Sequence, residues 1–155
     1  MRNFYQILAS ICMICTGCDD KTVKTEASTP SVKYFEKYND DKKLKELSEK
    51  IITQGDTISF NEMADIYMIT GHQKEFLYYS MRISNDYNYH GGYYMTYLIL
   101  HTDVENGSNK KINKLANYNL LKAYELGNKN AKRNIKSRFE KIKIPKSEEY
   151  WDQIQ

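Results

Sequence analysis

Cysteine, proline and recognisable catalytic motifs are scarce in this chain. Its 155 residues include three Cys and two Pro, and no segment alternates apolar and polar residues as a half-buried strand would. The sequence contains no H-E-x-x-H, no G-x-S-x-G, no phosphate-binding glycine loop and no paired Cys and His. Its three histidines, His72, His90 and His101, fall in different predicted elements. These absences predict an all-α protein that is no enzyme and that uses neither a cofactor nor a metal.

The first twenty residues have the pattern of an export signal. Arg2 supplies a positive charge, and an apolar run from Phe4 to Ile14 follows that is too short to span a bilayer as a stable helix. The small residues Thr16 and Gly17 come directly before Cys18. We therefore expect residues 1–17 to be a signal peptide that is removed.

The C-T-G-C segment at residues 15–18 resembles the lipobox of bacterial lipoproteins, although position 15 is usually aliphatic. The resemblance implies that Cys18 is acylated and becomes the first residue of a mature protein anchored in the cell envelope and facing the periplasm. Asp19 is similar to the inner-membrane retention signal of enteric lipoproteins. Cys12, Cys15 and Cys18 also have the spacing of a metal motif, but two of them lie in the segment expected to be removed. The mature chain would keep one cysteine and form no internal disulfide.

Beyond Cys18 the composition predicts one domain on a tether. Residues 18–38 are polar and contain Pro30, which favours a flexible linker, with a short helix over Ser31–Tyr38 as the alternative. Residues 39–145 are expected to form the helical domain, and residues 146–155 a C-terminal tail.

Apolar residues within 39–145 recur at helical spacing, as Leu44, Leu47 and Ile51 do. Ser59 with Glu62 forms a capping box that predicts the start of a second helix. The Gly91-Gly92 pair is expected to break the chain. The predicted helices cover about 40–54, 59–70, 74–84, 93–104, 112–126 and 128–142, with a loop at 106–109.

Two of these segments resemble the second helices of Sel-one-like repeats, which are short tetratricopeptide-type helix pairs. They are K-E-F-L-Y-Y at 74–79 and L-A-N-Y-N-L-L-K-A-Y-E-L-G-N at 115–128, and residues 91–97 resemble a domain found beside such repeats in bacterial lipoproteins. The resemblance implies a short right-handed α/α repeat array in which small alanines let helices approach closely. A generic helical bundle is the alternative. The matching positions are Lys74, Tyr78, Tyr79, Ala116, Lys122, Ala123, Glu125, Gly127, Asn128 and Ala131.

Tyrosine is abundant, with fourteen residues, and Tyr87, Tyr89 and Tyr93 flank the predicted turn at residues 90–92. One interpretation is that these rings fill gaps between helices. The other is that they form a contact surface for a partner, because tyrosine loses little entropy on binding.

Charge is distributed unevenly along the chain. Residues 55–106 carry seven acidic and two basic residues, whereas residues 107–146 carry twelve basic and two acidic residues. Lys132 and Lys136 lie on the predicted helix of the basic half and are candidate contacts for an acidic protein or for anionic lipid headgroups. A merely solvated helix face is the alternative. Nucleic acid is not expected as a partner of an envelope protein.

Small lipoproteins with degenerate Sel-one-like helices resemble the immunity partners of phospholipases and other envelope-targeting effectors. The resemblance implies a membrane-anchored periplasmic binding protein that neutralises a cognate toxic effector sterically. A structural or assembly adaptor of an envelope complex is the alternative. The residues expected to contact the protein partner are Tyr87, Tyr89, Tyr93, Lys132 and Lys136, and the membrane is reached through lipid on Cys18.

Overall fold

The computed structural model describes residues 29–105, 110–140 and 142–152, and residues 103–105 only by their backbone. The predicted signal peptide, Cys18, Asp19 and the loop at 106–109 lie outside these ranges. The described part is all helical and contains no strand, so the predicted all-α class is confirmed. Its helices are α1 (Pro30–Tyr38), α2 (Asp41–Gln54), α3 (Thr57–Ile69), α4 (Leu77–Tyr87), α5 (His90–Glu105), α6 (Lys110–Glu125), α7 (Lys129–Arg138) and α8 (Ser147–Trp151).

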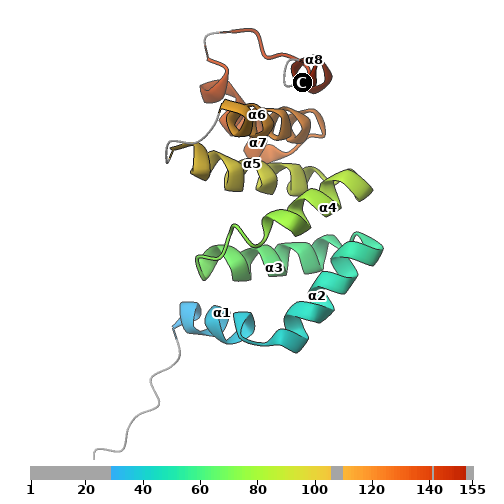
Figure 1. Ribbon diagram of the computed structural model, residues 1–155, viewed down its shortest axis with the longest axis vertical. Coiled ribbons are helices and arrows are strands. Elements are labelled where there is room, and N and C mark those ends of the chain that lie inside the picture. Colours follow the sequence, from blue (N-terminus) through green and yellow to red (C-terminus); the bar gives the residue numbers. More distant parts are fainter. Residues whose placement is uncertain (1–28, 106–109, 141, 153–155) are drawn as a thin grey trace, which may run out of the picture.

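The helices stack along one long axis, with α1 at one end and α8 at the other (Figure 1). Each helix packs mainly on its near neighbours in the sequence: α1 on α2 and α3, α2 on α3 and α4, α4 on α5, and α6 on α5, α7 and α8. An array of this kind gains its stability from local interfaces between successive helices.

Two clusters of buried side chains form the interior. The first joins α2, α3 and α4 and is rich in aromatic rings, with Phe60 and Phe76 at a centroid separation of 5.1 Å. The second joins α5, α6 and α7 and contains small residues, including Ala123 and Ala131, which are fully buried. The predicted core position of Ala123 is therefore confirmed. Leu77 packs against both clusters and connects them.

Helix α1 occupies part of the segment predicted as tether, so the alternative of a short helix holds for residues 30–38. It buries no residue completely and is fastened by its last turn. The Tyr38 ring stacks on His72 at 4.0 Å between centroids, and its hydroxyl donates a hydrogen bond to Glu75 at 3.0 Å. Lys37 forms an ion pair with Glu62. These contacts attach the start of the described chain to α3 and to the turn that follows it.

The start of α3 differs from the prediction. Asp56, not Ser59, is the N-cap, and its carboxylate accepts hydrogen bonds from the backbone N–H groups of Ile58 and Ser59. Ser59 is buried in the first turn and donates its hydroxyl to Asp56 at 2.6 Å. Glu62 therefore does not complete a capping box, and the cap lies three residues earlier than the predicted Ser59 cap.

The junction of α4 and α5 also differs from the prediction. Helix α4 covers Leu77–Tyr87 instead of 74–84 and ends at Asn88, which takes the left-handed conformation at φ 52°. The glycine pair does not break the chain, because α5 begins at His90 and includes both glycines. A Cβ atom on Gly92 would lie 2.6 Å from Cγ2 of Ile83. The glycine is needed for the close approach of α5 to α4.

At the C-terminal end, Gly127 takes φ 83° after α6 and Asn128 caps α7, as predicted. Helix α7 ends at Arg138, four residues before the predicted end at 142. The predicted C-terminal tail contains α8, which packs on α6. The Glu125 carboxylate caps α8 by accepting hydrogen bonds from the Ser147 N–H and hydroxyl at 2.7 and 2.5 Å.

Candidate functional site

Three turns of the array are linked by side-chain contacts and lie along one edge, on the right in Figure 1. They are the turns between α2 and α3, between α4 and α5, and between α6 and α7, and we refer to residues 54–57, 87–90 and 125–129 together as the turn edge. From α2 onward, successive helices run alternately toward this edge and away from it, so every second turn falls on the same side (Figure 1). The turn edge thereby collects residues that are far apart in the sequence.

The three tyrosines predicted as one contact surface have different environments. Tyr87 is 41% exposed; its ring lies over Gly55, and its hydroxyl donates a hydrogen bond to the Ile52 carbonyl at 2.8 Å. Tyr89 is half-buried and packs edge-on against Phe60 at 5.6 Å between centroids. Tyr93 is 6% exposed and belongs to the second core cluster, and burial raises its pKa.

Tyr93 is therefore a core residue and cannot belong to a docking surface on the folded chain. Tyr87 and Tyr89 remain on the turn edge, where both also stabilise the fold. The interpretation of tyrosine as a filler between helices thus holds fully for Tyr93 and partly for the other two.

His90 and Asn128 join the second and third turns. The Asn128 side-chain N–H₂ lies 3.1 Å from Nδ1 of His90 and donates to the His90 carbonyl at 3.4 Å. Its side-chain oxygen accepts from the N–H groups of Asn130 and Ala131 and so caps α7. Asn128 is 8% exposed. One amide therefore holds the N-terminus of α7 against the α4–α5 turn, a link that sequence patterns missed because the partners are 38 positions apart.

A row of cations follows directly from this junction along α7. Lys129, Lys132, Arg133 and Lys136 are all exposed, on the side of α7 opposite the buried Ala131 and Ile135. We call these four residues the basic stripe. It includes Lys132 and Lys136, the two lysines predicted to contact a partner.

The basic stripe has no carboxylate partner among the described residues. None of its three lysines has an ion pair there, and the Arg133 guanidinium contacts the side-chain oxygen of Asn130, a neutral group. A surface hollow beside the stripe is lined by Tyr124, Glu125, Gly127, Asn128, Lys129 and Lys132. Both oxygens of Glu125 accept hydrogen bonds from Ser147, so the carboxylate that borders the hollow is already engaged.

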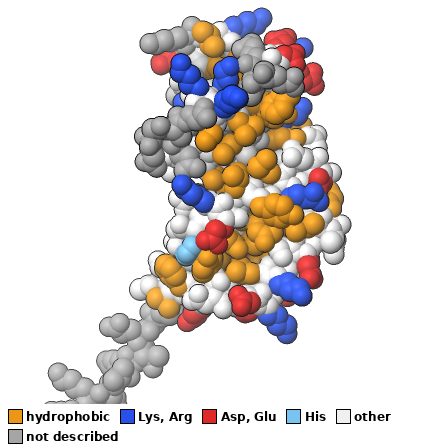
Figure 2. Space-filling model, in the orientation of Figure 1, with side chains coloured by type: hydrophobic (Ala, Val, Ile, Leu, Met, Phe, Trp, Pro, Cys, Tyr) orange, Lys and Arg blue, Asp and Glu red, His pale blue; other side chains and the backbone are white. Residues whose placement is uncertain are grey.

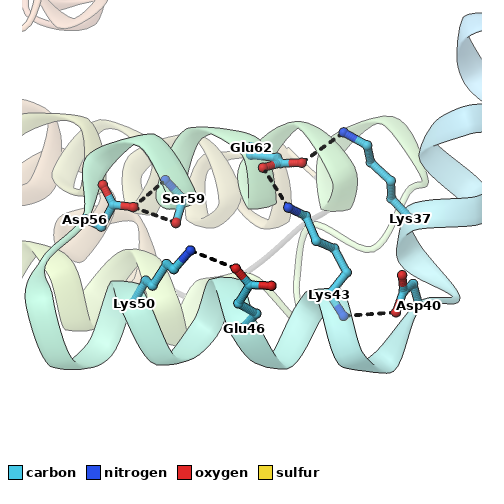
Figure 3. Close-up of polar contacts among 8 residues, drawn as sticks. All are labelled: Lys37, Asp40, Lys43, Glu46, Lys50, Asp56, Ser59 and Glu62. Carbon is cyan, nitrogen blue, oxygen red and sulfur yellow. Dashed lines mark hydrogen bonds and ion pairs between the residues drawn. The ribbon is translucent and has the colours of Figure 1, made fainter.

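Charges at the other end of the array are arranged differently (Figure 3). Glu62 on α3 lies between Lys37 at 2.9 Å and Lys43 at 3.3 Å, and these ammonium groups, Lys37 first, hold its pKa below the usual range. Glu46 pairs with Lys50 at 2.8 Å on α2. These charged side chains of α1–α3 thus neutralise one another, which is typical of a structural surface.

In the space-filling view, several Lys and Arg side chains gather in the upper part of the face shown, with acidic side chains at its margins, and the charges of the lower part are interspersed (Figure 2). The turn edge and the basic stripe form a continuous surface, because Asn128 and Lys129 belong to the third turn and Lys132 lies one helical turn further on. This surface is the candidate binding site.

Over residues 29–105, 110–140 and 142–152, no helix combines the length and the apolar character that crossing a bilayer requires. In the same ranges no three His, Cys, Asp or Glu side chains are grouped so that they could hold a metal ion. Comparison with protein-family models, curated proteins and solved structures finds no match to this chain.

Proposed function

We propose that this chain is a membrane-anchored periplasmic binding protein, and specifically an immunity protein that neutralises an envelope-targeting effector by covering its working surface. The observation that carries the proposal is the surface of the turn edge and the basic stripe, in which the turn that bears the exposed Tyr87 is joined to the positively charged helix α7 by the contact of His90 with Asn128. Surfaces of this kind suit protein recognition, because aromatic anchors supply contact area and charges steer the encounter.

The internal contacts of the surface support a role in tight binding. The Tyr87 hydroxyl is tied to α2, and His90 is tied to Asn128 at the start of α7. Groups that are held before binding lose little conformational entropy when a partner docks. Steric occlusion needs only such a rigid surface and no catalytic group.

The anchor is proposed from the lipobox-like segment at residues 15–18. Lipid on Cys18 would keep the inhibitor where an envelope-targeting toxin acts. Labelling cells with a palmitate analogue tests this part directly. We expect the full chain and a Cys12→Ser control to be labelled and a Cys18→Ser variant to remain unlabelled, because only the Cys18 thiol is the acceptor. Label that survives Cys18→Ser would refute the anchor.

The binding role is tested by recovering partners from the native envelope with the tagged full chain. The test variant combines Tyr87→Ala with Lys132→Glu and Lys136→Glu, and the control changes two exposed lysines of α2, Lys42→Glu and Lys45→Glu. We expect one partner to be recovered by the parent and the control and lost from the test variant.

The identity of that partner separates the two functions of the binding class. A secreted toxin whose activity the chain suppresses supports immunity, whereas a resident component of an envelope complex supports the adaptor function. Equal recovery by the test variant and the parent would exclude this surface as the binding site.

A further inference from the structure

We propose that the basic stripe of α7 is the docking site for an acidic surface on a protein partner. This inference rests on the proposed binding function and names the chemistry of the partner. It concerns Lys129, Lys132, Arg133 and Lys136, which share the solvent side of one helix.

The spacing of these cations matches a linear acidic target. Positions 129, 132, 133 and 136 are i, i+3, i+4 and i+7, so their side chains form one row over two helical turns, or about 10 Å. The opposite side of α7 carries Ala131 and Ile135, which are buried against the second core. The helix therefore cannot rotate to spread its charges, and the row has a fixed orientation on the molecule.

Holding these charges together lowers the stability of the free chain. Like charges at i, i+3 and i, i+4 repel one another, and Lys129 stands in the first turn of α7, where the helix dipole disfavours a cation. No acidic residue occupies that turn to offset the repulsion. On α1 and α2, by contrast, four lysines have carboxylate partners: Lys37, Lys43, Lys45 and Lys50. An acidic partner would remove this repulsion when it docks.

The place of α7 in the array favours a protein over the membrane that holds the anchor. The chain reaches the described structure at α1, whereas α7 lies near the opposite end of the long axis (Figure 1). Successive packed helices are 8–10 Å apart, so an upright array keeps the stripe several Debye lengths, of about 8 Å each, from the bilayer surface. In that orientation lipid headgroups are screened from the stripe, whereas a protein of the periplasm can reach it.

The test uses the full chain with Cys18→Ser in a neutral detergent, so that acylation does not mask weak contacts. The probes are poly-L-glutamate and, separately, vesicles of zwitterionic lipid containing about a third phosphatidylglycerol. The variants are Lys132→Glu with Lys136→Glu, and the matched control Lys42→Glu with Lys45→Glu, which changes the net charge equally on α2. Binding is measured by fluorescence anisotropy or co-sedimentation over a series of salt concentrations.

We expect the parent and the control to bind poly-L-glutamate within about 3-fold of each other and the stripe variant to bind at least 10-fold more weakly with a shallower salt dependence. Equal weakening in the control would show that only net charge matters and would overturn the proposal. Stripe-dependent binding to the vesicles but not to the polypeptide would also overturn it, in favour of a membrane contact. Neither result bears on acylation or on whether the parent chain recovers a partner from the envelope, so a failure of this proposal is distinguishable from a failure of the proposed function.

Discussion

Replacing Gly92 with alanine tests how α5 is held against α4. A Cβ atom at this position would lie 2.6 Å from Cγ2 of Ile83, 2.6 Å from the Ser84 hydroxyl and 2.9 Å from the Ser80 carbonyl. The carbonyl is backbone inside α4, and the Ser84 hydroxyl is buried and donates to that same carbonyl at 2.5 Å. None of these atoms is the end of a flexible side chain, so α5 must move away from α4 to admit the methyl group.

The cost of Gly92→Ala follows from two opposing effects. Overpacking a filled interface destabilises by about 1–3 kcal/mol, whereas Gly→Ala inside a helix stabilises by up to about 1 kcal/mol. We expect a net loss of about 1–2 kcal/mol in the free energy of unfolding. Urea unfolding followed by circular dichroism should show a lower midpoint with an unchanged slope, because the surface exposed on unfolding is the same.

Gly91→Ala is the matched control, one residue earlier in the same helical turn. Its Cβ atom would meet only the outer atoms of the Tyr89 ring, at 2.5 Å from Cε1, and a side-chain ring can rotate where a backbone carbonyl cannot. We expect this variant to lose less than half as much stability. A Gly92→Ala chain at least as stable as the parent would refute the close approach of α4 and α5 and the helical assignment of the glycine pair.

Three further changes test other contacts. Glu62→Gln should lower stability by about 0.5–1 kcal/mol at pH 7. The lysine partners lower the pKa of Glu62 in the folded chain, so the stability difference between the variant and the parent should be complete above the ordinary carboxyl pKa. It should vanish as the pH falls through the lowered pKa of Glu62. A stability difference that persists at pH 2 in urea titrations would contradict this. Ser147→Ala removes the donor hydroxyl that meets Glu125, and faster amide hydrogen exchange confined to α8 is expected; unchanged exchange would show that the contact is dispensable. Ala123→Leu should overpack the second core and lower the free energy of unfolding by about 1–3 kcal/mol. An unchanged melting temperature would place Ala123 outside that core.

Local patterns were sufficient to predict most helices and some of their ends. Helix α2 follows from the apolar spacing of Leu44, Leu47 and Ile51, and the ending of α6 follows from Gly127 and Asn128. These features were predicted correctly because the hydrogen bonds of a helix cap, and the repeat of apolar residues along a helix, connect residues within four positions of one another.

The prediction failed where distant packing outweighed local preference. Residues 74–76 have helical composition, but the Phe76 ring is fully buried between Phe60 and Tyr67, and the chain forms turns there before α4 begins at Leu77. A glycine pair usually ends a helix, yet here the absence of a side chain at Gly92 lets α5 pack closely against α4. Ser59 is a suitable cap, but Asp56 caps the helix and accepts the Ser59 hydroxyl as well.

The sequence by itself determined the all-α class and the separation of acidic from basic segments, because composition and short-range periodicity encode both. The export signal and the lipobox-like segment stay predictions from the sequence. Only the tertiary structure decided that Tyr93 is buried and that His90 meets Asn128. It also decided that the lysines of α7 face solvent with no carboxylate partner in the described part of the chain, while Lys37 and Lys43 are paired with Glu62. The physical reason is that a side chain's partners are set by which helix faces pack together. That choice depends on the volumes of residues tens of positions apart, such as Gly92 and Ile83, which interact only after the chain has folded.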